Sequence, residues 1–172
     1  PTYTPGAGET GTVTLTLTVQ PLNGACTPVN DAMAINITTI PTVSAGVDAT
    51  ICSTETYTLD GTTNVTGTWT SSGTGAFAPN ATTADAIYTP SLADIQDGQV
   101  QLTFTTTASG SCQDISDVMT LTIWKQPTVS TGNDGAICGN GTYQVLDATA
   151  TDYASLLWTL NAGATGSLQN AT

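Results

Sequence analysis

The chain has 172 residues, of which 13 are acidic and one, Lys125, is basic; it has no histidine, and its formal net charge at pH 7 is −12. This charge argues against nucleic-acid binding, because contacts to phosphates need lysine and arginine. No run of 18 apolar residues occurs, so we expect no direct membrane insertion. A serine or cysteine nucleophile would have no histidine as its base, so we expect no enzyme and no catalytic residues.

Residues 1–40 contain two stretches in which apolar and polar residues alternate. The first starts at Thr12 and places four threonines on one face. A period of two predicts a half-buried strand whose threonine-lined face meets solvent. Because Tyr3-Thr4-Pro5 returns as Tyr88-Thr89-Pro90, this part is interpreted as the C-terminal half of a repeat. Its apolar positions are Val13, Leu15, Leu17 and Val19 in the first stretch and Met33, Ile35 and Ile37 in the second.

A long internal repeat sets the domain organisation. The sequence PTVSAGVDATIC at 41–52 returns as PTVSTGNDGAIC at 127–138, an offset of 86 residues (127 − 41). Similarity at a fixed period indicates a tandem array, and a unit of this length can bury a modest core. We therefore expect the C-terminal half of one repeat at 1–40, a complete repeat at 41–126, and the N-terminal half of the next at 127–172.

The complete repeat is predicted to be all-β. Only residues 91–97 could form a helical turn. About seven short strands separated by turn signals, with no sustained helical period, indicate tandem Ig-like antiparallel β-sandwiches. The expected strands lie near 42–52, 57–59, 67–70, 76–78, 86–88, 100–105 and 119–123.

The ordered motifs of this unit resemble a known repeat family. They run PxVxAGxDxxIC, TYTLDG, GTWTSSGTG, YTPS, VQLTFT and MTLTI, and together they resemble the Ig-like and PKD-like tandem repeats of giant bacterial cell-surface adhesins of the gliding-motility type. The resemblance implies secretion, an extended stalk and no catalytic residues. PKD-like units often carry an aspartate-rich loop after the second strand, whereas Gly61-Thr62-Thr63-Asn64 has no charge, which argues against calcium at that loop.

From the repeat and the resemblance we expect a structural stalk or spacer segment of an extracellular adhesin or filament on the bacterial cell surface. Pro41 and Pro127 would stiffen the junctions and pack between repeats. The alternative is an Ig-like glycan-binding or accessory module of a secreted carbohydrate-active protein. The expected partners are neighbouring repeats of the same chain, with surface glycans or other surface proteins beyond them.

The three tryptophans are expected in two environments. Trp69-Thr70 and Trp158-Thr159 are repeat equivalents, and a tryptophan in the third strand of such a sandwich is typical of its core. Trp124 lies on the face opposite the apolar positions of the last strand. It is predicted to face outward at the junction beside Pro127 and to pack between repeats, with ligand binding as the alternative.

Several aspartates are candidate calcium ligands. Asp94, Asp97, Asp114 and Asp117 come nearest to a cluster in the sequence, and Asp31/Asp117 and Asp48/Asp134 recur in phase. Calcium needs several oxygen ligands that lie close together, and turn formation by aspartate side chains explains the same pattern. The second interpretation is favoured, so we expect no cofactor.

Four cysteines occupy repeat-equivalent positions: Cys26 with Cys112 and Cys52 with Cys138. Without histidine or a CxxC motif, disulfides in an oxidising compartment are favoured over zinc. Cys52–Cys112 is the simplest pair within one repeat. The expected strand order argues against it, because it puts them at opposite ends of the sandwich, about 20 Å apart, beyond disulfide reach. The hypothesis is that bridges join neighbouring repeats.

Overall fold

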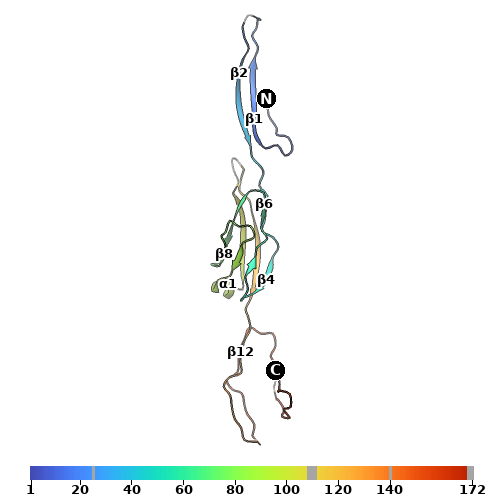
Figure 1. The fold of residues 1–172 in the computed structure, drawn as a ribbon, viewed down its shortest axis with the longest axis vertical. Coiled ribbons are helices and arrows are strands. Elements are labelled where there is room, and N and C mark those ends of the chain that lie inside the picture. The colour runs from blue at the N-terminus through green and yellow to red at the C-terminus, as the bar shows by residue number, and fades with distance from the viewer. Residues whose placement is uncertain (25, 108–111, 140, 170–172) are drawn as a thin grey trace.

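The computed structural model describes residues 1–172 except 25, 108–111, 140 and 170–172, so the end of the expected third repeat lies outside the described residues. The chain is elongated (Figure 1), with an N-terminal hairpin, a central sandwich and a C-terminal segment following one another along one axis. No helix in the described part is long and apolar enough to cross a membrane. The described residues form strands and one short helix, so this part of the chain is all-β, as the alternation predicts.

The N-terminal hairpin consists of β1 (Gly11–Val19) and β2 (Val29–Ile37), paired antiparallel. Both strands were predicted, but their apolar face is not half-buried along its whole length. Leu17 is 72% exposed and Met33 is 59% exposed. The reason is that β1 and β2 form a sheet of two strands over which no other described strand packs (Figure 1).

The central repeat is a sandwich built around a four-stranded sheet of order β4-β11-β10-β7. A three-stranded sheet of order β5-β9-β8 and the pair β3-β6 complete it. The strands of the first sheet are β4 (Ala49–Cys52), β7 (Thr66–Ser71), β10 (Gln99–Thr107) and β11 (Ser116–Trp124). The others are β3 (Val43–Ser44), β5 (Tyr57–Thr58), β6 (Thr62–Thr63), β8 (Ala76–Ala78) and β9 (Ile87–Thr89).

Two details differ from the expected sandwich of seven antiparallel strands. The first expected strand is divided into β3 and β4, which belong to different sheets, because the chain turns at Gly46 with a φ of 86°. The second expected strand corresponds to β5 alone, and β6 lies outside every expected strand. In addition, β4 pairs parallel to β11. Because short strands can change sheets, one segment of the chain contributes to both layers of the sandwich. The alternation of apolar and polar residues does not show where such a change occurs.

The core lies between the layers of the central repeat. Trp69 is 1% exposed, and its ring stacks on Phe104 with centroids 4.6 Å apart. Its indole N–H donates a hydrogen bond to the Ala84 carbonyl at 3.1 Å. The buried apolar side chains around this pair come from both layers: Leu59, Tyr88, Val100, Leu102, Met119, Leu121 and Ile123.

One helix, α1 (Leu92–Asp97), occupies the stretch where a helical turn was expected. Ser91 caps its N-terminus and forms a reciprocal capping box with Asp94, and Gly98 ends it with a φ of 76°. Leu92 is 79% exposed, whereas Asp94 is 2% exposed. The helix therefore presents a carboxylate to the interior.

The C-terminal segment begins with the same local structure as the central repeat. Strands β12 (Thr128–Ser130) and β13 (Thr149–Thr151) pair antiparallel, as β3 and β6 do. Gly132 turns the chain with a φ of 83°, at the position equivalent to Gly46. In both places the glycine N–H donates to the serine hydroxyl two residues earlier. Repeated sequence therefore forms repeated structure here.

Candidate functional site

The junction between the hairpin and the central repeat is held by Asn64. Its side-chain oxygen accepts a hydrogen bond from the Thr42 N–H at 2.8 Å, and its side-chain nitrogen donates to the Ile40 carbonyl at 2.9 Å. These two bonds span Pro41, which is buried. One side chain of the sandwich thus binds the linker on both sides of a proline, which restrains the linker direction.

The opposite end of the central repeat is closed by Ser53. Its N–H donates to the Trp124 carbonyl at 2.8 Å, and its hydroxyl accepts from the Gln126 N–H at 3.1 Å. Trp124 is 68% exposed, as an outward position at the junction predicts. Pro127, which follows, is exposed. Ser53, which follows β4, therefore binds the chain where it leaves the sandwich. Figure 1 shows β12 beyond this end and the N-terminal hairpin beyond the other.

Two aspartates that recur in phase join β11 to the segment containing β3 and β4. Asp117 accepts a hydrogen bond from the Ala45 N–H at 2.9 Å. Asp48 accepts one from the Thr120 N–H at 2.7 Å. Bonds from backbone N–H groups to carboxylates are stronger than neutral ones. These two aspartates thus fix the register of the first strands against the last.

The calcium candidates lie apart or have protein partners. Asp94 is buried beneath α1 and Asp117 is engaged with Ala45. Asp97 is exposed at the helix end, and Asp114 lies in the loop before β11. Among the residues that the structure describes, no three Asp, Glu or Cys side chains gather where they could hold a metal ion.

Asp94 is the centre of a buried polar network. Its carboxylate accepts hydrogen bonds from the Tyr88 hydroxyl at 2.7 Å, the Ser91 N–H at 3.0 Å and the Thr74 N–H at 3.0 Å. Since the Tyr88 hydroxyl donates to Asp94, it accepts from Ser71 at 2.9 Å. The network joins β7, β9 and α1 at one point, so it closes this end of the sandwich.

The network shifts the pKa values of both of its acidic groups, Tyr88 and Asp94. Burial raises the pKa of Tyr88, the hydrogen bond from Ser71 lowers it, and the bond to the Asp94 carboxylate and its charge raise it further, so that it reaches about 12. Burial acts to raise the pKa of Asp94 as well. Its hydrogen bonds from Ser91, Tyr88 and Thr74 outweigh burial and hold that pKa below its ordinary value.

The shift of Tyr88 predicts a loss of stability in alkali. The unfolded chain ionises this phenol near pH 10, whereas the folded chain does so at about 12. Its contribution is therefore fully present below about pH 10 and is lost as pH rises toward 12, by about 2–3 kcal/mol in all. Urea unfolding followed by circular dichroism at pH 9, 10 and 11 measures it. Tyr88→Phe should flatten this dependence; an equal slope in the variant would contradict the assignment.

The cysteines, all free thiols, lie at the two ends of the repeats. Cys52 is the parallel partner of Trp124 in β4-β11, whereas the Cys112 thiol lies 3.0 Å from the Thr38 hydroxyl, at the N-terminal junction. Along β11 the positions of Trp124 and Ser116 are eight residues apart, or about 26 Å. A Cys52–Cys112 bridge therefore exceeds disulfide geometry.

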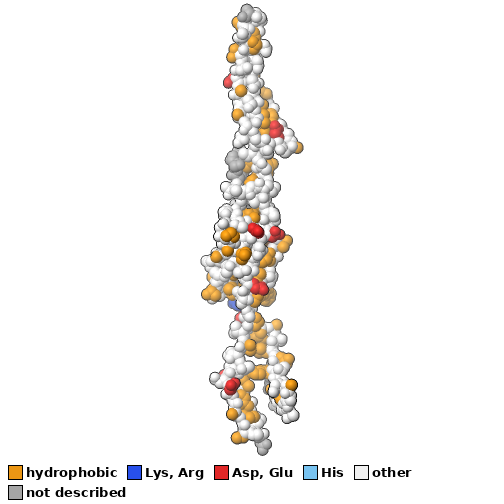
Figure 2. All heavy atoms as spheres, viewed as in Figure 1, with side chains coloured by type: hydrophobic (Ala, Val, Ile, Leu, Met, Phe, Trp, Pro, Cys, Tyr) orange, Lys and Arg blue, Asp and Glu red, His pale blue; other side chains and the backbone are white. Residues whose placement is uncertain are grey.

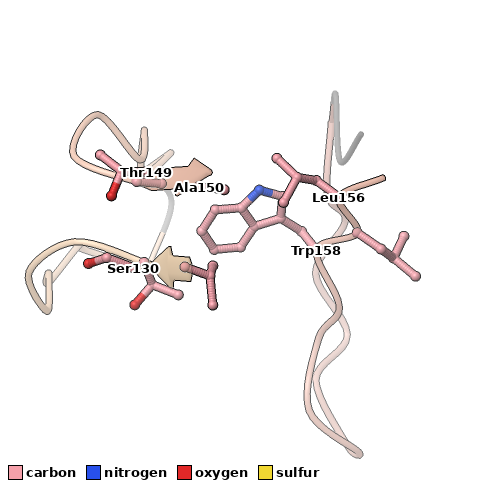
Figure 3. Close-up of a pocket in the computed structure, with 9 residues that line it drawn as sticks. Ser130, Thr149, Ala150, Leu156 and Trp158 are labelled. Atoms are coloured by element: carbon pink, nitrogen blue, oxygen red, sulfur yellow. The ribbon is translucent and has the colours of Figure 1, made fainter. Parts of the chain in front are cut away.

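The C-terminal segment contains an apolar groove of about 150 Å³ between β12, β13 and Trp158. In the close-up, the Trp158 indole points toward Ser130 and Ala150 (Figure 3). Trp158 was expected in a core like Trp69, but it is only partly buried. No described strand pairs beside it as β10 pairs with β7 beside Trp69, so the groove stays open. Its neighbours in the groove wall include Val129, Leu156 and Leu157.

Sequence reasoning missed the Asp94 network and the Asn64 bridge. The Ser91-x-x-Asp94 pattern is a capping-box signal, and it could have placed Asp94 in the first turn of a helix. The role of Asn64 has no local signal, because its partners lie 22 and 24 residues away.

No protein-family model matches the chain, and no curated protein or solved structure matches it significantly.

Proposed function

We propose that this chain is a stalk or spacer segment of an extracellular, repeat-rich bacterial surface protein, an adhesin or a surface filament. The observation that carries the proposal is the position of the two junctions of the central repeat. The N-terminal hairpin precedes the central sandwich at one end, and the segment with β12 follows it at the opposite end (Figure 1). Repeats connected in this way add length rather than bulk.

The junction contacts support a mechanical role. Asn64 binds the linker on both sides of Pro41, and Ser53 binds it before Pro127. Each repeat would thereby hold its neighbours in line without a large interface. The surface fits an exposed spacer as well: in Figure 2 the few acidic side chains are scattered along the whole length of the molecule.

Small-angle scattering tests the extended shape. A compact domain of this length has a radius of gyration of about 16 Å. Three units in line, each given a length of about 30 Å, which is that of a nine-residue strand, have a radius of gyration of about 26 Å. We expect the larger value from the reduced chain at low concentration. Asn64→Ala removes the linker bonds and should broaden the distance distribution, whereas Asn80→Ala, in a loop of the same repeat, should leave it unchanged. A compact value for the unmodified chain would contradict the proposal.

Exposed Trp124 supports the second candidate, a glycan-binding module, because an exposed aromatic ring can stack on a sugar face. Glycan-array binding by the chain that is lost in Trp124→Ala would favour this candidate. Absence of binding with an extended scattering profile would favour the stalk.

A further inference from the structure

The first segment and the last strand of the central repeat lie side by side and point in the same direction. β4 belongs to the first segment of the repeat, and β11 is its last strand. They pair in parallel from Ala49 opposite Leu121 to Cys52 opposite Trp124. The two parts of the sandwich that connect it to the rest of the chain are therefore bonded directly to each other.

A pull on the two ends of this repeat acts along these strands. The strands of the sandwich run roughly along the long axis of the molecule, with the hairpin beyond one end and β12 beyond the other (Figure 1). Tension draws β4 toward the hairpin and β11 toward β12, in opposite directions along the strand axes. Parallel strands are joined by evenly spaced bonds, so this displacement shears all of the bonds together rather than breaking them one after another.

Two carboxylates extend the contact beyond the paired residues. Asp48, just before β4, accepts a hydrogen bond from the Thr120 N–H at 2.7 Å. Asp117, near the start of β11, accepts one from the Ala45 N–H at 2.9 Å. Hydrogen bonds to an ionised acceptor are stronger than neutral ones. Both bonds join the first segment to the last strand, so the same displacement stretches them.

Ser53 continues the contact where the chain leaves the sandwich. Its N–H donates to the Trp124 carbonyl at 2.8 Å, and its hydroxyl accepts from the Gln126 N–H at 3.1 Å. Tension that arrives at Gln126 is therefore passed to the residue that follows β4 as well as to β11.

The inner side of the contact is shielded from water. Ala45, Ile51 and Ile123 are buried in the core of the sandwich. Hydrogen bonds are electrostatically stronger in such surroundings than in water. Water that could replace a stretched bond reaches the strands from the outer face alone, which slows their separation.

We propose that this contact is a tension-resisting clamp, made of the β4-β11 pairing, Asp48 and Asp117, which holds the central repeat closed when the chain is pulled from both ends. The inference deepens the stalk function and rests on it for the source of the pull. Forced unfolding is governed by the unfolding rate rather than by equilibrium stability. Bonds that break before the barrier set this rate, whereas bonds that are still intact at the barrier leave it unchanged.

The two aspartates of the clamp recur in phase with the repeat. Asp134 follows Asp48 by 86 residues (134 − 48), and Asp117 follows Asp31 by 86 residues (117 − 31). The whole chain has only 13 acidic residues, so two carboxylates kept in phase fit a contact that each repeat needs.

Single-molecule force spectroscopy of the chain, held by peptide tags at its two ends, measures the resistance. Residues 41–126 comprise 86 residues. At about 3.6 Å per extended residue, less a folded length of about 30 Å, their unfolding lengthens the chain by about 280 Å. We expect this lengthening in one step. Separation of β4 or β11 in a smaller step at lower force, with the rest of the sandwich still folded, would overturn the proposal.

Substitutions separate the clamp from overall stability. Asp48→Ala removes the acceptor of the Thr120 N–H and should raise the rate of unfolding at a fixed force about tenfold. Asp117→Ala should act in the same direction. The control is Asp94→Ala, because the Asp94 network joins β7, β9 and α1 and stays intact while the clamp breaks.

Asp94→Ala should lower stability toward urea but change the rate of forced unfolding by less than about twofold. Circular dichroism verifies that each variant is folded before it is pulled. Equal effects of Asp48→Ala and Asp94→Ala on the forced rate would overturn the proposal, since the resistance would then follow overall stability.

The direction of the pull provides an independent test. An azide-bearing amino acid in place of Gln99, which is exposed, takes one handle, and the C-terminal tag takes the other. Gln99 lies opposite Thr122, so this pull peels β11 from β10 one pair after another. The rupture force should be lower than in the end-to-end pull, and an equal or higher force would overturn the proposal. That outcome would leave the extended shape standing, because scattering measures the shape without tension.

Discussion

Trp69→Ala is expected to destabilise the central repeat by about 3–5 kcal/mol, the usual cost of removing a buried tryptophan. Trp69 is 1% exposed, stacks on Phe104 and donates to the Ala84 carbonyl. Alanine would leave a cavity and an unstacked Phe104 ring between two thin layers, and it would remove one of the two hydrogen bonds that the Ala84 carbonyl accepts. A unit of about 86 residues has a total stability of about 4–13 kcal/mol, so this loss is a large share of it.

Urea unfolding followed by far-ultraviolet circular dichroism measures the effect. Trp124→Ala is the matched control, since it removes the same side chain at a position that is 68% exposed and should cost less than about 1 kcal/mol. Equal losses in the two variants would contradict the position of Trp69 in the core.

Asp94→Ala is expected to lower the free energy of unfolding by a similar amount, about 3–5 kcal/mol. The substitution leaves the Tyr88 hydroxyl and the Thr74 and Ser91 N–H groups without their acceptor. Buried donors without an acceptor are costly, and bonds to a carboxylate contribute more than neutral ones. Asp97→Ala is the control, because Asp97 is exposed on the same helix, and it should change stability by less than about 0.5 kcal/mol.

The effect of Asp94→Ala should depend on pH. The folded pKa of Asp94 lies below its ordinary value, so the contribution of its charge is present above about pH 4 and is lost as pH falls through the folded pKa. The difference between the unmodified chain and Asp94→Ala should therefore narrow below pH 4. A difference that widens in acid would show that the hydrogen bonds favour the protonated carboxyl.

Asp94 also shows why local sequence patterns do not reveal every buried site. Its neighbours in sequence place it in the first turn of a helix, but its burial follows from the approach of β7 and β9. A Cβ on Gly73 would collide with the Asp94 carboxylate, so glycine is needed where the two segments meet. Such a contact joins residues 21 positions apart (94 − 73), and no local periodicity of the sequence indicates it.

The sequence by itself indicated most of the strands, the repeat and the helical turn, because these depend on local alternation, on a fixed period and on the spacing of Leu92 and Ile95. It also placed Trp69 through its equivalence to Trp158. The tertiary structure decided where strands change sheets, which of these two tryptophans is covered, and which cysteines lie at the same junction. Those outcomes depend on the strands that pack against each residue, and packing partners lie far along the chain.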